Sequence, residues 1–195
     1  MIKNILCTTF LVCSIFTTAQ TSTIKNLDNL FDKLELENKA MGTVSIFNNG
    51  TEVYQKNIGF SNLANKTTGD KFTKYRIGSI TKIFTTTIIL QQIDEGKLTL
   101  NSLLNEYFPA IQNANKITIE DLLRHQSGLA NITEDKDIAS WITKPQTREK
   151  MIARFVKNGI QFKPKEKSKY SNTNFIILSY ISEILDKKPF SEILN

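Results

Sequence analysis

Ser79 and Lys82 are the side chains in this sequence with the clearest capacity for chemistry. Lys82 is the only charged residue between Arg76 and Asp94, and it stands among apolar and threonine side chains. Because burial of an unpaired ammonium is costly, a lysine in such a segment needs a partner. Ser79 precedes it by three residues, which places both side chains on one face of a helix. A serine hydroxyl becomes an effective nucleophile when a neighbouring base takes its proton. The pair therefore predicts nucleophilic catalysis by Ser79, with Lys82 as its base.

The expected position of this pair at the start of a helix strengthens the prediction. The positive end of the helix and desolvation both disfavour a protonated lysine, which makes Lys82 a better base. The backbone N–H of Ser79, free in the first turn, would help to stabilise an oxyanion. The Ser-x-x-Lys pattern is weak evidence by itself, because the polar segment Ser22-Thr23-Ile24-Lys25 matches it too. The alternative is that Lys82 extends to the surface from a helix that only packs.

Tyr170-Ser171-Asn172 is the second candidate, directly before another predicted helix. A phenol and a carboxamide two residues apart could face one pocket, where the tyrosine relays a proton and the amide holds a substrate carbonyl. The alternative is that Asn172 is an ordinary helix N-cap. The sole histidine, His125, invites a Ser-His-Asp interpretation. We disfavour it, because His125 lies near a predicted helix C-terminus, where a histidine is favourable anyway, and no Gly-x-Ser-x-Gly is present.

The segment 75–97 is expected to carry the nucleophile. Its periodicity is ambiguous, because many of its residues are β-branched. The run is too long for an ordinary strand, and Gly96 followed by Lys97 is typical of a helix end. We therefore predict a helix that is buried on nearly every side.

A hairpin and further helices complete the predicted fold. Strand segments 42–47 and 51–60 flank Asn48-Asn49-Gly50, whose residues tolerate the positive φ of a tight turn. Further helices are expected over 25–40, over 146–158, over 175–185, and from Thr118, in a capping box with Asp121, to Gly128. Strands followed by helices predict an α+β fold with a helical lobe over a sheet.

Residues 1–19 are typical of an export signal. Lys3 supplies a positive charge, an apolar run follows over 5–16, and Thr17-Thr18-Ala19 provides small residues for cleavage. The run is too short to span a bilayer, so we expect export to the periplasm or the extracellular space without a stable membrane anchor. The alternative, a buried N-terminal helix, explains neither Lys3 nor the Thr-x-Ala ending.

The charge and the cysteines exclude two further classes. The formal net charge is +6, but the lysines alternate with apolar and acidic residues instead of forming a block, so a nucleic-acid partner is not expected. Cys7 and Cys13 both lie within residues 1–19, so the mature chain is expected to fold without disulfides.

Three segments together resemble the motifs of one family. Arg76–Lys82 is similar to the nucleophile motif of serine β-lactamases and penicillin-binding proteins. Leu122–Leu129 is similar to a structural segment of the branch that contains class C β-lactamases, esterases and D-stereospecific peptidases. Tyr170-Ser171-Asn172 resembles the second catalytic motif of that branch. The resemblance implies a β-lactamase/transpeptidase-like α+β fold, in which helices pack on an antiparallel sheet beside a helical lobe.

The same resemblance implies a role for each candidate residue. Ser79 would form the acyl-enzyme and Lys82 would activate it. Tyr170 would work with Lys82 to protonate the leaving group and to activate the deacylating water. Asn172 would orient the substrate and help to position Lys82, whereas His125 would be structural. No metal or organic cofactor is implied.

The implied function is a serine hydrolase that acts on amide, β-lactam or ester bonds of a small-molecule or peptide substrate. The alternative is a non-catalytic binding or sensor module that retains the fold.

The chain departs from the family pattern at Lys165 and Asn174, where glycine is common, and this affects the expected shape of the loop more than its chemistry. A third motif, Lys or His followed by Thr or Ser and Gly, does not follow Tyr170. We therefore expect residues 20–195 to form an incomplete domain that lacks C-terminal strands and is a poor enzyme alone.

Overall fold

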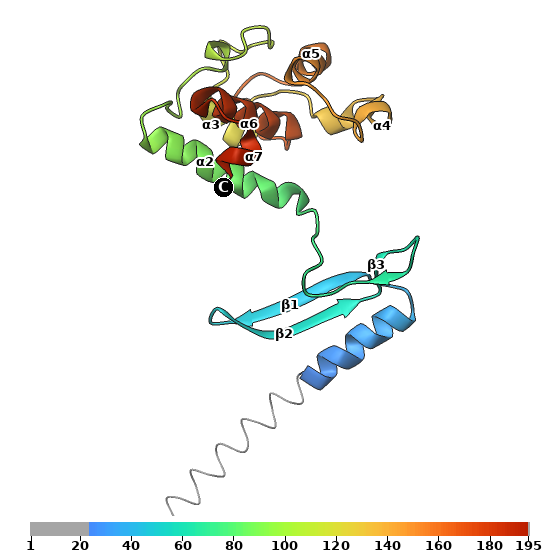
Figure 1. The fold of residues 1–195 in the computed structure, drawn as a ribbon. Coiled ribbons are helices and arrows are strands. Elements are labelled where there is room, and N and C mark those ends of the chain that lie inside the picture. Colours follow the sequence, from blue (N-terminus) through green and yellow to red (C-terminus); the bar gives the residue numbers. More distant parts are fainter. Residues whose placement is uncertain (1–23, 195) are drawn as a thin grey trace, which may run out of the picture. The chain divides into compact units, whose positions relative to one another are not determined.

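An antiparallel hairpin forms where the Asn-Gly turn predicts it. The computed structural model describes residues 24–194 (Figure 1), so the predicted export signal at 1–19 lies outside the described residues. Strand β1 (Gly42–Asn48) pairs with β2 (Thr51–Ile58), and Gly42 lies opposite Ile58. Asn49 and Gly50 both adopt positive φ, 47° and 78°, as the turn requires.

The second strand ends earlier than the predicted residue 60. Gly59 has a φ of 65°, which interrupts the extended backbone after Ile58. A short second hairpin follows, in which β3 (Phe60–Asn62) pairs antiparallel with β4 (Thr67–Thr68).

The first helix, over residues 24–36, packs along the hairpin (Figure 1). Tyr54 on β2 donates a 2.9 Å hydrogen bond to Asp28, and its ring centre lies 6.1 Å from that of Phe31. Lys56 Nζ reaches Asp32 at 2.6 Å. The helix ends before the predicted residue 40, since Asn38 takes a left-handed φ of 52°.

The chain divides into two units at the Arg76–Ile77 bond, and the second, helical unit holds every candidate catalytic residue. Its two longest helices are α2 (Thr81–Asp94), which follows the 3₁₀ turn η1 (Gly78–Ile80), and α6 (Asn172–Asp186). The other elements of this unit are η2 (Leu104–Glu106), α3 (Ile119–Leu123), η3 (Ile132–Glu134), α4 (Ile138–Trp141), α5 (Arg148–Asn158) and α7 (Phe190–Ile193). Among the described residues the four strands lie in the first unit beside one helix, and the remaining helices lie in the second unit, so the fold is α+β as predicted.

One apolar core fills the helical unit, and α2 contributes a single face to it. Ile88 and Ile89 of α2 are buried, and Gln92 donates to the backbone oxygen of Ser182 on α6. In contrast, 65% of Ile83 and 49% of Phe84 are exposed. The prediction of burial on nearly every side is therefore wrong. Helix α6 packs against α2, and the buried residues of α2 are Thr85, Ile88, Ile89 and Gln92.

The predicted helix start at Thr118 is confirmed, but several other predicted helix ends are wrong: α2 begins at Thr81 and not at 75, and α6 begins at Asn172 and not at 175. Thr118 and Asp121 form the predicted capping box, with each backbone N–H donating to the other side chain at 3.0 and 3.2 Å. Helix α3 nevertheless ends at Leu123 and not near Gly128, because His125 adopts a left-handed φ of 56°. Helix α5 lies within the predicted 146–158. None of the helices among residues 24–194 is long and apolar enough to cross a membrane.

Candidate active site

All four predicted site residues meet in the helical unit. Ser79 Oγ lies 2.8 Å from Tyr170 Oη and 3.2 Å from Lys82 Nζ. Lys82 also donates to Asn172 Oδ1 at 2.8 Å, and Tyr170 Oη donates to the same oxygen at 3.3 Å. The structure therefore brings the nucleophile candidate within hydrogen-bonding distance of two groups that can exchange its proton.

Ser79 lies in the 3₁₀ turn directly before α2. Gly78 takes a φ of 53°, a conformation that is easy for glycine, and Ser79 follows in η1 with its side chain exposed. Neither Ile77, before η1, nor Ile80, before α2, caps the helix with its side chain. Because Ser79 lies at the N-terminal end of α2, the positive end of the helix dipole is close to Ser79, where an oxyanion would form, and no side-chain cap competes for the free N–H groups.

Lys82 points inward to polar partners and does not extend to solvent. Its side chain is partly buried, and its ammonium lies 5.0 Å from the ring centre of Tyr170 and 5.6 Å from that of Phe175. Its hydrogen bonds to Ser79 and Asn172 hold it on the i, i+3 face that the sequence predicts. This geometry does not match the alternative of a lysine that merely extends to the surface.

Tyr170 has the electrostatic environment of a proton carrier. The neighbouring Lys82 ammonium lowers the pKa of the Tyr170 phenol most, and the hydrogen bond with Ser79 lowers it further, although burial opposes both effects. A phenol whose pKa is lowered gives up its proton more readily at neutral pH. Tyr170 is thus suited to proton transfer over the short distance to Ser79.

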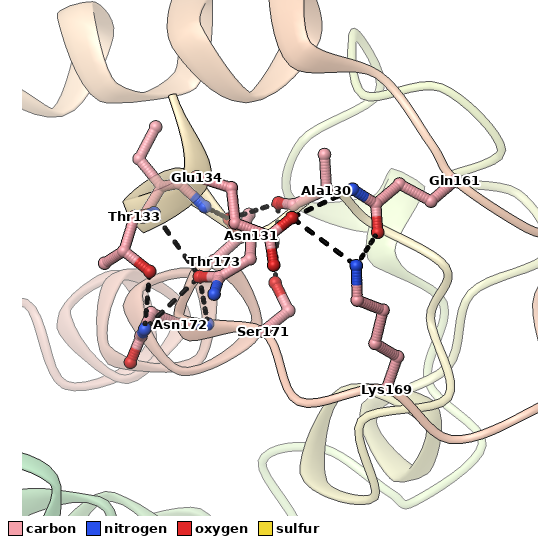
Figure 2. A network of polar contacts seen from close by, with 10 residues as sticks. Ala130, Asn131, Thr133, Glu134, Gln161, Lys169, Ser171, Asn172 and Thr173 are labelled. Atoms are coloured by element: carbon pink, nitrogen blue, oxygen red, sulfur yellow. Dashed lines mark hydrogen bonds and ion pairs between the residues drawn. The ribbon is translucent and has the colours of Figure 1, made fainter. Parts of the chain in front are cut away.

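Asn172 is the first residue of α6, and the alternative that it is an N-cap is wrong. Ser171 occupies the N-cap position. The Asn172 backbone N–H and side-chain Nδ2 both donate to Asn131 Oδ1, at 3.0 and 3.2 Å, and Nδ2 also lies 3.3 Å from Thr133 Oγ1 (Figure 2). With both acceptors on the Nδ2 side, the amide oxygen faces Lys82.

Sequence reasoning missed Asn131 and Thr133. A polar residue before a short helix is a usual N-cap, and Asn131 indeed caps η3 by accepting from the Thr133 backbone N–H. That local signal could have singled out Asn131. Its contact with Asn172, 41 positions away, has no counterpart in the sequence pattern.

Polar contacts tie the segment before η3 to the start of α6. Thr173 Oγ1 donates to the Ala130 carbonyl at 2.7 Å (Figure 2). It also accepts from the Ile132 N–H at 3.0 Å. Farther along the same network, Lys169 Nζ donates to Gln161 Oε1 at 2.7 Å and lies 3.4 Å from Glu134. The surroundings of Asn172 are therefore fixed from several directions.

The two departures from the family pattern lie in different structural settings. Lys165 has a φ of 67°, the left-handed conformation that glycine adopts easily, while its N–H donates to the Gln126 carbonyl. Asn174 lies within α6, fully buried, and its side-chain amide contacts Ser127 Oγ at 2.6 Å and His125 Nδ1 at 3.3 Å.

A hollow of about 430 Å³ adjoins Lys82 and Asn172. Its apolar walls include Ile132, Trp141, Met151, Phe175 and Phe190. Such a surface can accept an apolar group attached to a reacting carbonyl. Residues 24–194 contain no cluster of three or more histidine, cysteine, aspartate or glutamate side chains arranged to hold a metal ion.

Comparison with known proteins gives consistent relatives. Residues 27–195 match the family model described as Beta-lactamase. The teichoic acid D-alanine hydrolase of Staphylococcus aureus is 28% identical over 152 residues, which cover 77% of this chain and 36% of that protein. The crystal structure of FmtA from Staphylococcus aureus aligns with a TM-score of 0.70 and 26% identity, over 85% of this chain and 46% of that one.

A third relative is a D-stereospecific amidohydrolase from Streptomyces sp., with a TM-score of 0.57 and 28% identity. That alignment covers 66% of this chain and 43% of the amidohydrolase. The chain thus spans less than half the length of each matched chain.

Proposed function

The chain belongs to the beta-lactamase family, and from this premise we propose that it is part of a serine hydrolase that acts through an acyl-enzyme on Ser79. The observation that carries the proposal is the position of Ser79 Oγ, 3.2 Å from Lys82 Nζ and 2.8 Å from Tyr170 Oη. A hydroxyl between an amine and a phenol has the partners that nucleophilic catalysis requires.

Acylation in this site would proceed as follows. Lys82 first releases its extra proton to solvent, and the resulting amine takes the Ser79 proton while Oγ attacks the substrate carbonyl. The negative charge of the tetrahedral intermediate is stabilised at the helix start near the Ser79 N–H. Tyr170 donates a proton to the departing nitrogen or oxygen, and Lys82 returns a proton to the phenol. Asn172 holds Lys82 in place throughout.

Deacylation would use the same groups, with water as the nucleophile and Ser79 Oγ as the leaving group. A water molecule attacks the acyl carbonyl and loses its proton to the Lys82–Tyr170 pair. The bond between the acyl carbon and Ser79 Oγ then breaks, and Oγ recovers a proton from the pair. The products are the free acid and regenerated Ser79.

We propose esters or amides of D-amino acids as the substrate class. Among the relatives, one is described as a D-alanine hydrolase of teichoic acid and another as a D-stereospecific amidohydrolase. The apolar hollow beside Lys82 would receive the side chain or another apolar part of the substrate. A β-lactam, which contains a strained amide, remains the alternative substrate for the same chemistry.

We propose that residues 1–19 direct export and that residues 20–195 form part of a hydrolase domain working in the periplasm or outside the cell. The positive charge of Lys3, the apolar run and the Thr-Thr-Ala ending support the export proposal. A small-molecule or peptide substrate is then the expected partner, not a nucleic acid. The hydrogen-bonded set of Ser79, Lys82 and Tyr170 favours catalysis over a binding module that has only kept the fold.

The test is to treat the purified protein with a fluorophosphonate probe and locate the adduct by mass spectrometry. We expect one adduct on Ser79 and none in Ser79→Ala, whose fold should persist because the side chain is exposed. Turnover would then be compared for matched D- and L-alanyl esters. An adduct on another residue, or equal labelling of Ser79→Ala, would refute the assignment; faster turnover of the L-ester would refute only the substrate class.

A further inference from the structure

We infer that His125 is a positioning residue for Tyr170: its neutral imidazole, with the proton on Nε2, holds the Tyr170-Ser171 backbone so that the phenol meets Ser79. This inference rests on the proposed function of Ser79 and Tyr170. It assigns His125 a task that differs from the base of a Ser-His-Asp triad. Among the described residues no hydrogen bond joins His125 to Ser79.

His125 holds the chain on both sides of Tyr170. Its backbone carbonyl accepts the Lys169 N–H at 2.9 Å, and its Nδ1 accepts the Ser171 N–H at 3.1 Å. The imidazole also packs against the Tyr170 ring, with ring centres 4.7 Å apart. The residues before and after Tyr170 are thus fixed by one histidine, whose ring also contacts that of Phe175 on α6.

The polar surroundings of Nδ1 require that this atom carry no proton. Besides the Ser171 N–H, the side-chain amide of Asn174 lies 3.3 Å from Nδ1. The orientation of that amide is set by Ser127, which donates to Asn174 Oδ1 at 2.6 Å, so the Nδ2 hydrogens face the imidazole. Ser127 and Asn174 are 1% and 0% exposed, so solvent does not replace either contact.

A proton on Nδ1 would therefore face two donors and no acceptor. A buried donor without an acceptor is costly, and the Ser171 N–H would lose its partner at the same time. The second donor to Nδ1 is the side-chain amide of Asn174. Glycine, which is common at this position in the family pattern, has no side chain and could not supply it. This second donor makes the neutral imidazole a condition of the observed Tyr170 position.

Burial and the nearby charge of Lys82 also favour the neutral form of His125. Burial lowers its pKa most, from the ordinary 6.5, and the positive charge of Lys82 lowers it further. Two further cations lie near His125. Arg124, the preceding residue, pairs with Glu120 at 2.6 Å, and Lys169, whose N–H donates to the His125 carbonyl, binds Gln161 and Glu134. Tyr170 is the remaining titratable group in contact with the ring. Acidification should protonate His125, break the bond to Ser171 and release Tyr170.

Two substitutions of His125 distinguish the role of its Nδ1 acceptor from the role of its aromatic ring. His125→Asn offers an amide oxygen close to the place of Nδ1, does not titrate, and tolerates the left-handed φ of 56°. His125→Phe keeps a ring against Tyr170 but leaves the Ser171 N–H, on a residue that is 2% exposed, without its acceptor.

The experiment measures the rate of Ser79 labelling by the fluorophosphonate from neutral pH into the range below 6.5. At neutral pH we expect His125→Phe to react about 10- to 100-fold more slowly and His125→Asn to stay within about threefold of the wild type. The wild type should lose reactivity on acidification, and His125→Asn should lack that step. Equal rates for the wild type and His125→Phe, or the same acid step in His125→Asn, would overturn the inference.

An NMR titration of the unmodified protein tests the inference without activity. The ¹⁵N shifts of His125 should show an Nε2-protonated ring at neutral pH, and the Ser171 amide proton should shift as His125 titrates. A ring protonated on Nδ1, or a Ser171 amide that does not respond, would refute the positioning role even if Ser79 reacts normally. If Ser79 does not react in the wild type, the proposed function fails, and this titration still decides the inference.

Discussion

Lys82 Nζ donates a 2.8 Å hydrogen bond to Asn172 Oδ1 and thereby joins the first turn of α2 to the first residue of α6, 90 positions apart. The bond exists only if the Asn172 amide presents its oxygen, because an ammonium has no acceptor to offer an NH₂ group. The orientation of one side-chain amide thus determines where the candidate base lies.

Replacement of Asn131 by alanine should release that orientation. Asn172 would lose the oxygen that accepts both its backbone N–H and its Nδ2, and Nδ2 would keep only Thr133 Oγ1, so the amide could rotate and Lys82 would move away from Ser79. We expect Ser79 labelling to slow about 10- to 100-fold and the free energy of unfolding to fall by about 1–3 kcal/mol. Thr133→Val, which removes one acceptor of Nδ2, is the matched control and should slow labelling less. If both variants label like the wild type, Asn131 does not position Asn172.

Lys82→Met should abolish acylation while the fold persists. The lysine is only partly buried, and methionine fills similar space without a charge, so we expect the free energy of unfolding to change by less than about 1 kcal/mol. Lys82→Arg keeps a cation but provides no base and should be equally inactive. Rapid labelling of Ser79 in Lys82→Arg would indicate that charge alone suffices.

The stability of the protein should fall on acidification in a way that depends on His125. Its pKa in the folded state lies below the unfolded value of 6.5, so the unfolded chain takes up this proton first. Stability is therefore full above 6.5 and declines as the pH falls from 6.5 toward the lower folded-state pKa. Urea midpoints of the wild type and His125→Asn, measured across this range, should diverge as the pH falls. Parallel midpoints would mean that His125 has the same pKa in both states.

Gly128→Ala should destabilise the helical unit strongly. Gly128 has a φ of 79°, and an added Cβ would lie 2.0 Å from the Phe162 carbonyl oxygen, a backbone atom that cannot move independently. We expect a loss of more than about 2 kcal/mol in the free energy of unfolding, measured by urea titration.

Gly96→Ala is the matched control for Gly128→Ala. Gly96 has a similar φ of 72° but open space around its Cβ position, so only backbone strain of about 1 kcal/mol applies. Equal losses for both variants would show that the contact with Phe162 relaxes.

The features that could be predicted from the sequence are those that depend on residues close together along the chain. The Asn49-Gly50 turn, the Thr118–Asp121 capping box and the spacing of Ser79 and Lys82 are all set by local backbone geometry. For Tyr170, only the resemblance of its motif indicated that it would lie near these residues.

The features that sequence reasoning missed depend on tertiary packing. The acceptors of Asn172 come from a segment 41 residues away, and the bond from Ser171 to His125 spans 46 residues. The exposure of Ile83 could not be deduced either, since apolar residues are spread around α2 and the sequence pattern does not single out the face that packs in the core.

The uncapped start of the nucleophile helix implies a trade-off between stability and activity. A serine, threonine or aspartate at a helix N-cap usually stabilises the fold by about 1 kcal/mol. The N-cap of η1 is Ile77 and that of α2 is Ile80, and neither side chain can accept a hydrogen bond. A capping oxygen would compete with the substrate for the N–H groups beside Ser79. Laboratory evolution for thermal tolerance alone should therefore enrich capping residues at these positions and, in the same variants, diminish turnover.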